Sequence, residues 1–278
     1  MTIDPRPLCA LTIAGSDSGG GAGIQADLKT FAAHGVHGLC AIAALTAQNT
    51  RGVSAVHVPP AGFLRAQIDA CFDDFRVGVI KIGMLANAEL IDAVIDAIEA
   101  HEPAFVVLDP VMVATSGARL LDADALDALR RLIAHASLIT PNIPEAEWLL
   151  AETIADDAAA ERAMDALLAL GAGAVLLKGA HLPAGDPGDA HAAEVTDRFS
   201  DGRERIAFRN PRLPIEGHGS GCTLASAIAA QCVLGKTLPQ ACADAITYVA
   251  GALAHSTRPG RGDARVLAHF WRMACAPR

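Results

Sequence analysis

The segment Gly217-His-Gly-Ser-Gly-Cys222 combines three glycines with an apolar stretch that follows it. Leu224, Ile228 and Val233 recur at helical spacing, so the glycines stand at the start of a predicted helix. The first turn of a helix has backbone N–H groups without helical acceptors, and glycine lets an anion approach them closely. The pattern therefore predicts an anion site, with a plain glycine-rich helix start as the alternative.

A second glycine-rich segment, Gly15-Ser-Asp-Ser-Gly-Gly-Gly-Ala-Gly23, joins an apolar run to the next predicted helix. It could form a phosphate loop, or its glycines could serve only to avoid steric clashes in a tight turn. It lacks the Lys-Ser/Thr pair of a Walker A motif. Ile24 stands where a dinucleotide-binding pattern beginning at Gly19 would need its third glycine, which disfavours a dinucleotide-dependent oxidoreductase.

Three charged side chains stand where predicted elements begin or end. Lys178 closes an apolar run, where an unpaired ammonium would be costly, so it is expected to meet a carboxylate or a phosphate. Asp109 ends another such run and Glu145 lies at a helix start. Together these carboxylates could hold Mg²⁺ near phosphates, usually through water, or each could be a solvated charge or a partner of a helix dipole. His218 is interpreted as a packing residue of its loop rather than as a base.

The elements that must position these residues alternate along the chain. We expect strands at 9–14, 39–45, 53–58, 77–82, 104–109, 138–139 and 174–177, a hairpin over 194–208, and helices at 24–35, 62–75, 87–101, 122–135, 144–150, 156–170, 222–234 and 239–255. Strands separated by helices indicate an α/β fold of parallel βαβ units, in which ligands bind beyond the carboxyl ends of the strands. Since no composition break occurs, residues 1–278 are predicted to form one domain.

The composition of the 278 residues limits the class of protein. Hydrophobic residues make up 52% and aromatic residues only 4%, which suits helices packed on a parallel sheet. A formal charge of -9 argues against nucleic-acid and anionic-membrane partners. The seven cysteines form no CxxC pair, so reduced thiols are expected rather than a zinc site. With no signal peptide and no membrane span, the protein is predicted to be cytoplasmic.

Seven ordered segments resemble the ribokinase-like superfamily and, within it, the hydroxymethylpyrimidine/phosphomethylpyrimidine kinases of thiamine biosynthesis. They are AGSDSGGGAGIQADLKTF (14–31), TAQNTRGV (46–53), KIGML (81–85), LDPVM (108–112), ITPNIPEAEWL (139–149), LLKGAH (176–181) and HGSGCTLASAIAA (218–230). Cys222 is the most discriminating residue, because most relatives, including classical pyridoxal kinases, carry Asp there. Gly217 and Ser220 stand where Thr is common, and the segment 260–265 lacks the proline of the family's closing motif.

The resemblance implies a three-layer αβα fold with a mainly parallel central sheet flanked by helices. It implies an ATP- and Mg²⁺-dependent kinase, typically homodimeric, that phosphorylates 4-amino-5-hydroxymethyl-2-methylpyrimidine and then its monophosphate to the diphosphate. Two alternatives remain open: a pyridoxal/pyridoxine kinase of the same superfamily, and a non-catalytic protein that senses ATP or a pyrimidine.

The resemblance also implies roles for individual residues. Those matching substrate-binding positions are Gly15, Asp27, Gln48 and Met84. Those matching ATP- and Mg²⁺-binding positions are Asp109, Asn142, Glu145 and Lys178, with the metal held by Asp109 and Glu145 through water. The anion hole corresponds to Gly219, Ser220, Gly221 and Cys222, and the catalytic residues to Cys222 and Lys178.

Cys222 has two possible roles in this reaction. Because the start of a helix lowers the pKa of a thiol from about 8.5, Cys222 is expected to have a lowered pKa and could accept the proton of the attacking alcohol. Alternatively, its thiol only orients the alcohol. Only the first phosphorylation needs a base, because the phosphate that attacks in the second is already largely anionic near neutral pH.

Overall fold

A computed structural model of the chain describes residues 5–113, 117, 120–182, 194–215 and 217–274. The other residues of the predicted domain 1–278 lie outside this description. Within the described ranges, no helix is both long enough and apolar enough to cross a membrane.

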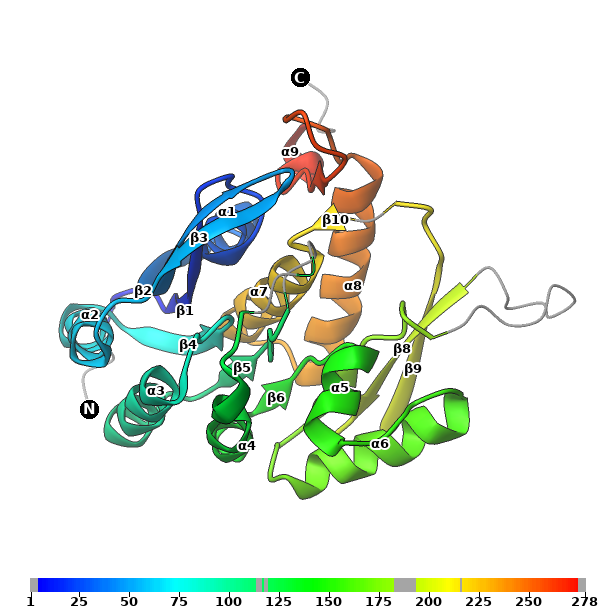
Figure 1. Cartoon of the computed structure of the whole chain (residues 1–278), viewed down its shortest axis with the longest axis horizontal. Coiled ribbons are helices and arrows are strands. Elements are labelled where there is room, and N and C mark those ends of the chain that lie inside the picture. The colour runs from blue at the N-terminus through cyan, green and yellow to red at the C-terminus, as the bar shows by residue number, and fades with distance from the viewer. Residues whose placement is uncertain (1–4, 114–116, 118–119, 183–193, 216, 275–278) are drawn as a thin grey trace, which may run out of the picture.

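One sheet runs through the centre of the molecule (Figure 1). Its strands are β1 (Cys9–Asp17), β2 (His37–Asn49), β3 (Gly52–His57), β4 (Val77–Ile82), β5 (Val106–Leu108), β6 (Leu138–Ile139), β7 (Val175–Leu177), β8 (Glu194–Ser200) and β9 (Arg205–Pro211). Their spatial order is β3-β2-β1-β4-β5-β6-β7-β8-β9. The run from β2 to β7 is parallel, while β3, β8 and β9 pair antiparallel with their neighbours. The predicted mainly parallel sheet is confirmed.

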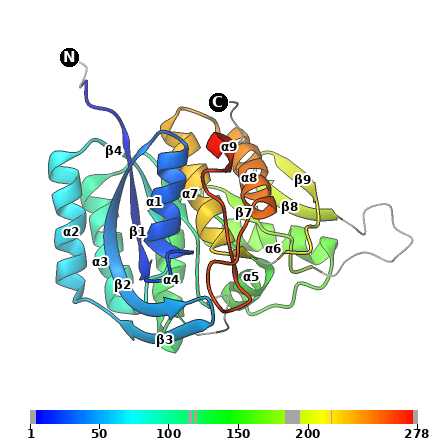
Figure 2. The same ribbon diagram turned by 90° about the horizontal axis from the view of Figure 1, so that it is seen from above.

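Helices cover both faces of this sheet, so the predicted three-layer arrangement is confirmed (Figures 1 and 2). One face packs against α1 (Gly23–Ala33), α7 (Ser220–Val233) and α8 (Leu238–Ala254). The other packs against α2 (Ala61–Asp74), α3 (Ala88–His101), α4 (Leu126–Ile133), α5 (Ile143–Leu150) and α6 (Asp157–Ala169). A 3-10 turn (Ala123–Ala125) precedes α4, and α9 (Trp271–Ala274) ends the described chain.

The central strands are apolar on both faces, as a sheet between two helical layers requires. On β4, Ile80 and Ile82 join the core on the side of α2 and α3, while Val79 joins the core on the side of α7. Successive side chains of a strand point to opposite faces, so a continuous apolar run supplies both cores. Alanines at 225, 227, 229 and 230 are fully buried and let α7 fit between the sheet and α8.

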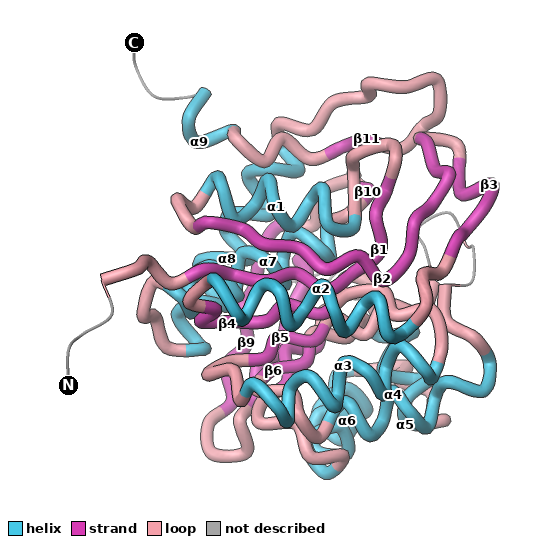
Figure 3. Tube along the Cα trace, turned by 90° about the vertical axis from the view of Figure 1, so that its left-hand side faces the viewer, coloured by secondary structure: helices cyan, strands magenta, loops and turns pink. Residues whose placement is uncertain are grey.

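Two features depart from the expected elements. β1 continues past the predicted end at Ala14 to Asp17, with a shift in register at Gly15, so the glycine-rich segment begins inside the strand. A second small sheet pairs β10 (Gly217–His218) with β11 (Arg265–Val266). Figure 3 shows this pair beside the ends of β1 and β2, so the last part of the chain supports the predicted anion loop.

Candidate active site

A cavity of about 1110 Å³ opens where the parallel strands end. Most of the residues singled out from the sequence line it: Gly15, Gln48, Met84, Asp109, Asn142, Glu145, Lys178 and the loop Gly219–Cys222. The structure therefore brings together seven segments that span more than 200 residues of the chain. Asp27 is the one predicted site residue that is not in this lining.

An ammonium group lies between two carboxylates on one wall of the cavity. The Nζ atom of Lys178 is 3.0 Å from Oδ1 of Asp109 and 3.7 Å from Oε2 of Glu145. Burial alone would lower the pKa of Lys178, but the two carboxylates raise it above its ordinary value. Burial raises the pKa of Glu145 to about 7, although the charge of Lys178 opposes this. The expectation that Lys178 meets a carboxylate is confirmed.

Glu145 is also part of a capping box at the start of α5. Its backbone N–H donates to Oδ1 of Asn142 over 2.8 Å, and its Oε2 accepts from the Asn142 backbone N–H over 2.7 Å. The box satisfies two N–H groups that a helix start leaves without partners. Glu145 is therefore held by the helix start and by Lys178 together, which fits its interpretation as a partner of the helix N-terminus.

The N-terminus of α7 faces this charge cluster. Gly219 has a φ of +80°, and a Cβ there would lie 2.1 Å from the carbonyl oxygen of Gly21, so only glycine fits. A Cβ on Gly221 would lie 3.3 Å from both Oδ2 of Asp109 and Nζ of Lys178. The first turn of the helix thus approaches the ion pair closely, which is the arrangement that an anion site requires.

The first glycine-rich segment is not a phosphate loop. The Asp17 carboxylate, 3% exposed, accepts hydrogen bonds from the backbone N–H groups of Gly19 at 2.7 Å and of Gly21 and Ala22 at 2.9 Å. An internal anion therefore already occupies the donors that would hold a phosphate. Of the two alternatives left open by the sequence, the steric one fits the structure, because Gly23 has a φ of +54° and a Cβ there would collide with the carbonyl oxygen of Gly15.

His218 does more than pack within its loop. Its Nε2 atom is 3.0 Å from Oδ2 of Asp17 and 3.1 Å from Nε2 of Gln48. These two contacts join three segments around the cavity. The sequence-based interpretation of His218 as a packing residue of its loop did not include them. Asp17 and His218 are 201 positions apart, so only the strand order of the sheet could have indicated their meeting.

Asp27 lies behind the cavity wall. It is fully buried (0% exposed), and its oxygens accept from Lys81 at 2.9 and 3.0 Å, from Thr12 at 2.6 Å and from Ser226 at 2.7 Å. The inner face of α1 turns the carboxylate toward the sheet and away from the cavity lining, and the predicted contact of Asp27 with the pyrimidine stays a prediction. The lysine that pairs with it, Lys81, begins one of the segments that carry the family resemblance (KIGML, 81–85), but no role was predicted for it from the sequence.

The thiol of Cys222 has a pKa opposite to the expected one. Burial raises its pKa to about 11, and the charges of Asp27 and Asp109 add to this. The charge of Lys81 and a hydrogen bond from the Gly23 backbone lower the pKa, but they do not compensate. The prediction of a lowered pKa is therefore wrong, because burial, together with the charges of the two carboxylates, outweighs the groups that would lower the pKa.

An apolar wall completes the cavity next to the anion loop. One face of α8 lines it with four side chains spaced three or four residues apart: Ile246, Val249, Ala250 and Leu253. Leu224 of α7 lies in the same wall. Sequence reasoning missed this wall, because the same spacing is typical of a core-facing helix.

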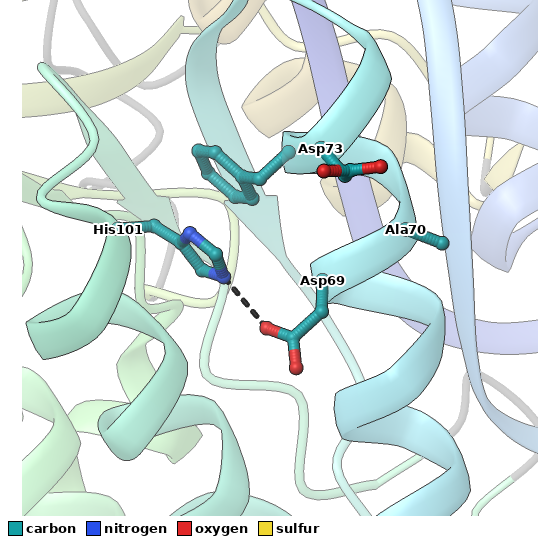
Figure 4. A pocket seen from close by; sticks show the side chains of 5 residues that line it. Asp69, Ala70, Asp73 and His101 are labelled. Carbon is teal, nitrogen blue, oxygen red and sulfur yellow. Dashed lines mark hydrogen bonds and ion pairs between the residues drawn. The ribbon is translucent and has the colours of Figure 1, made fainter.

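A smaller hollow of about 480 Å³ lies on the surface between α2 and α3 (Figure 4). There Nε2 of His101 is 2.6 Å from Oδ1 of Asp69, and the His101 ring stacks on Phe72 with centroids 4.2 Å apart. The hollow sits where these two helices end, so it is far from the carboxyl ends of the strands. In the described residues no group of three or more potential ligands could hold a metal ion.

The sequence of this chain is similar to those of kinases and other proteins of thiamine biosynthesis. The family profile described as phosphomethylpyrimidine kinase matches residues 17–267. A hydroxymethylpyrimidine/phosphomethylpyrimidine kinase from Rhizobium meliloti is 44% identical over 95% of this chain and 98% of its own length. A thiamine biosynthesis bifunctional protein ThiED from Geobacter sulfurreducens is 47% identical over 92% of this chain, but the chain spans only 51% of that relative.

The fold of this chain is similar to those of two kinds of solved vitamin kinase. A phosphomethylpyrimidine kinase from Clostridium difficile is 38% identical with a TM-score of 0.76, covering 87% of this chain and 98% of its own. A pyridoxal kinase from Staphylococcus aureus in complex with AMP-PCP and pyridoxal is 28% identical with a TM-score of 0.83, covering 97% and 96% of the two chains.

Asp27→Ala is expected to act on stability. Removing one partner of a buried ion pair leaves Lys81 charged without compensation, so the free energy of unfolding should fall by about 3–5 kcal/mol. Urea denaturation measures this, with Asp244→Ala as the control, because Asp244 pairs with Lys236 on the surface and its loss should cost at most about 1 kcal/mol. A raised KM for the pyrimidine with unchanged stability would instead place Asp27 in substrate binding.

Proposed function

The chain belongs to the phosphomethylpyrimidine kinase family, and from this premise we propose that it transfers the γ-phosphoryl group of ATP to 4-amino-5-hydroxymethyl-2-methylpyrimidine and then to the monophosphate. The observation that carries this proposal is the ammonium of Lys178 facing the N-terminus of α7 inside the cavity. A cation and a row of backbone N–H groups converge there on the space where a transferring phosphoryl group can lie.

The use of ATP is supported by one wall of the cavity and by a relative. The pyridoxal kinase from Staphylococcus aureus forms complexes with AMP-PCP and with ADP. In this chain the apolar side chains of α8, including Val249 and Leu253, lie next to the anion loop. We infer that an adenine ring packs there while its phosphates reach Lys178.

The carboxylates around Lys178 fit a magnesium ion. Mg²⁺ in kinases is held by one or two carboxylates together with water and substrate phosphates, which suits Asp109 and Glu145 on either side of the ammonium. A buried carboxylate whose pKa is raised to about 7 is one that a cation would stabilise in its charged form. The metal would neutralise phosphate charge, and Lys178 would share that task.

Positioning is the main contribution of the remaining residues. The backbone of residues 219–222 and the ammonium of Lys178 stabilise the negative charge of the transferring group. We propose that Cys222 orients the attacking alcohol and does not take its proton, since a thiol with a pKa of about 11 is protonated at neutral pH. Gly15, Gln48 and Met84 form the wall that receives the pyrimidine.

Neither alternative function is favoured by a specific observation. The solved pyridoxal kinase is 28% identical to this chain, against 38% for the solved phosphomethylpyrimidine kinase. A protein that only senses its ligands would have no need to keep Lys178 paired inside the cavity with both Asp109 and Glu145.

We further propose a single-domain, homodimeric, cytoplasmic enzyme without nucleic-acid or membrane partners. One sheet takes strands from residues 9 to 211, which supports one domain. Leu45, Val56 and Phe63 are exposed at the edge formed by β2, β3 and the start of α2, which suits a contact between subunits. The cysteines that the structure describes are free, as expected in a reducing compartment.

Incubation with Mg-ATP should convert 4-amino-5-hydroxymethyl-2-methylpyrimidine to the mono- and diphosphate, detected by mass spectrometry. Pyridoxal in a parallel assay should react with a kcat/KM at least about tenfold lower, the effect of one unmatched polar contact. Absence of both pyrimidine phosphates, with or without turnover of pyridoxal, would contradict the proposed function.

Lys178→Ala should lower kcat/KM about 10²–10³-fold for both phosphorylations, because the variant loses a cation at the developing charge. Steady-state kinetics with each substrate measures this. Lys236→Ala is the matched control, since Lys236 pairs with Asp244 on the surface, and it should leave the kinetics unchanged. Equal activity of the two variants would remove Lys178 from the reaction.

Cys222→Ser should keep at least about a tenth of kcat in the first phosphorylation, and the losses in the two steps should be similar. A thiol with a pKa of about 11 stays neutral as the pH rises from about 6 to 9, so kcat should show no thiol titration there. Cys40→Ser serves as the control. A kcat that rises about tenfold per pH unit in the wild type but not in Cys222→Ser would restore the general base.

A further inference from the structure

The side-chain amide of Gln48 can point its nitrogen or its oxygen toward His218. With the nitrogen toward His218, two groups around Gln48 cannot satisfy all of their hydrogen-bond contacts. Nε2 of His218 would have to donate to Asp17 at 3.0 Å and also accept from Nε2 of Gln48 at 3.1 Å. A ring nitrogen cannot do both, because it carries either a proton or a lone pair.

The second conflict is at Thr46. Its hydroxyl lies 3.0 Å from the carbonyl oxygen of Ser16 and 3.0 Å from Oε1 of Gln48. Both of these oxygens are acceptors, and one hydroxyl has only one proton to give.

Asp17 decides which nitrogen of His218 is protonated. Its carboxylate accepts three backbone N–H groups as well as the contact from the imidazole. Burial alone would raise the pKa of Asp17, but these hydrogen bonds, led by that of His218, hold it below the ordinary value. An ionised carboxylate can only accept, so Nε2 of His218 must carry the proton and donate it.

A half turn of the Gln48 amide removes the contact between two donors and the double use of the Thr46 hydroxyl. The amide oxygen then faces the protonated Nε2 of His218, whose single N–H is shared between Asp17 and Gln48, and the amide nitrogen donates to the hydroxyl of Thr46. That hydroxyl keeps its proton for the carbonyl of Ser16. The two ends of an amide have nearly the same shape, so the turn changes no packing and the network alone determines the orientation.

We propose that Asp17 and His218 act as positioning residues that fix the Gln48 amide with its oxygen toward the imidazole, so that Gln48 donates its second N–H to a ring nitrogen of the substrate. Gln48 lines the cavity, and this N–H is the one that the network leaves over. The inference rests on the proposed function, because it assigns which atoms of the pyrimidine this wall recognises.

The histidine is tested with two variants. His218→Leu removes the donor and frees the amide to turn, so KM for the pyrimidine should rise about ten- to hundredfold with KM for ATP unchanged. His218→Gln still carries an N–H that can reach both Asp17 and Gln48, and it should stay within about threefold of the wild type. His101→Leu breaks the histidine–aspartate contact drawn in Figure 4, whose residues are not part of the cavity lining, and should leave both KM values unchanged.

Two aminopyridine analogues, each with one ring nitrogen replaced by C–H, identify the recognised atom. The wild type should lose about ten- to hundredfold in kcat/KM with one analogue, and His218→Leu should discriminate much less between that analogue and the pyrimidine. If His218→Leu and His218→Gln raised the KM values for the pyrimidine and for ATP equally, His218 would have only a structural role, and the proposal would be overturned.

A measurement on the wild type keeps the test independent of the stability of the variants. Nitrogen NMR of the histidines, with His218→Gln to assign the signal, should show Nε2 of His218 protonated at neutral pH. A ring protonated only at Nδ1 would overturn the proposal. Turnover of the pyrimidine by the wild type in the same assays separates a failure of this inference from a failure of the proposed function.

Discussion

The buried ion pair of Asp27 and Lys81 is the constraint on which the arrangement of the active site depends. Both side chains are fully buried, and a charge in such a place is tolerated only when every partner is in position. The partners come from four elements, since Thr12 lies on β1 and Ser226 on α7. Ser226 is one helical turn beyond Cys222, so the pair that holds α7 against β1 and β4 also sets the position of the anion loop.

Cys222 and its loop lie between this buried pair and the cluster of Lys178 with Asp109 and Glu145. Both lysines have pKa values held above the ordinary value by neighbouring carboxylates, so both remain charged. A chain with a formal charge of -9 can therefore still present a local cation to a phosphate. The carboxylates that keep Lys178 charged are the same groups that can bind a metal ion. Binding of a metal ion would therefore change the electrostatic environment of the lysine.

Much of this arrangement could be predicted from the sequence, because it follows from local patterns. Apolar runs ending in a polar residue located Asp109 and Lys178 at the carboxyl ends of strands, and the glycines before an apolar helix located the anion loop. What could not be predicted depends on tertiary contacts. The direction in which α1 turns Asp27, the burial that raises the pKa of Cys222, and the meeting of Asp17 with His218 are all set by packing between distant segments.

The distances along the chain between these partners have a consequence for biosynthesis. Asp17 and His218 are separated by 201 positions, and Asp27 and Ser226 by 199. At ~5–20 residues per second, a ribosome needs ~10–40 s to make that stretch. During this time β1, α1 and β4 exist without the helix that covers their charged and apolar inner face. The nascent chain is therefore exposed to aggregation and to chaperone binding until α7 emerges, and ligand binding can begin only as one of the last events of folding.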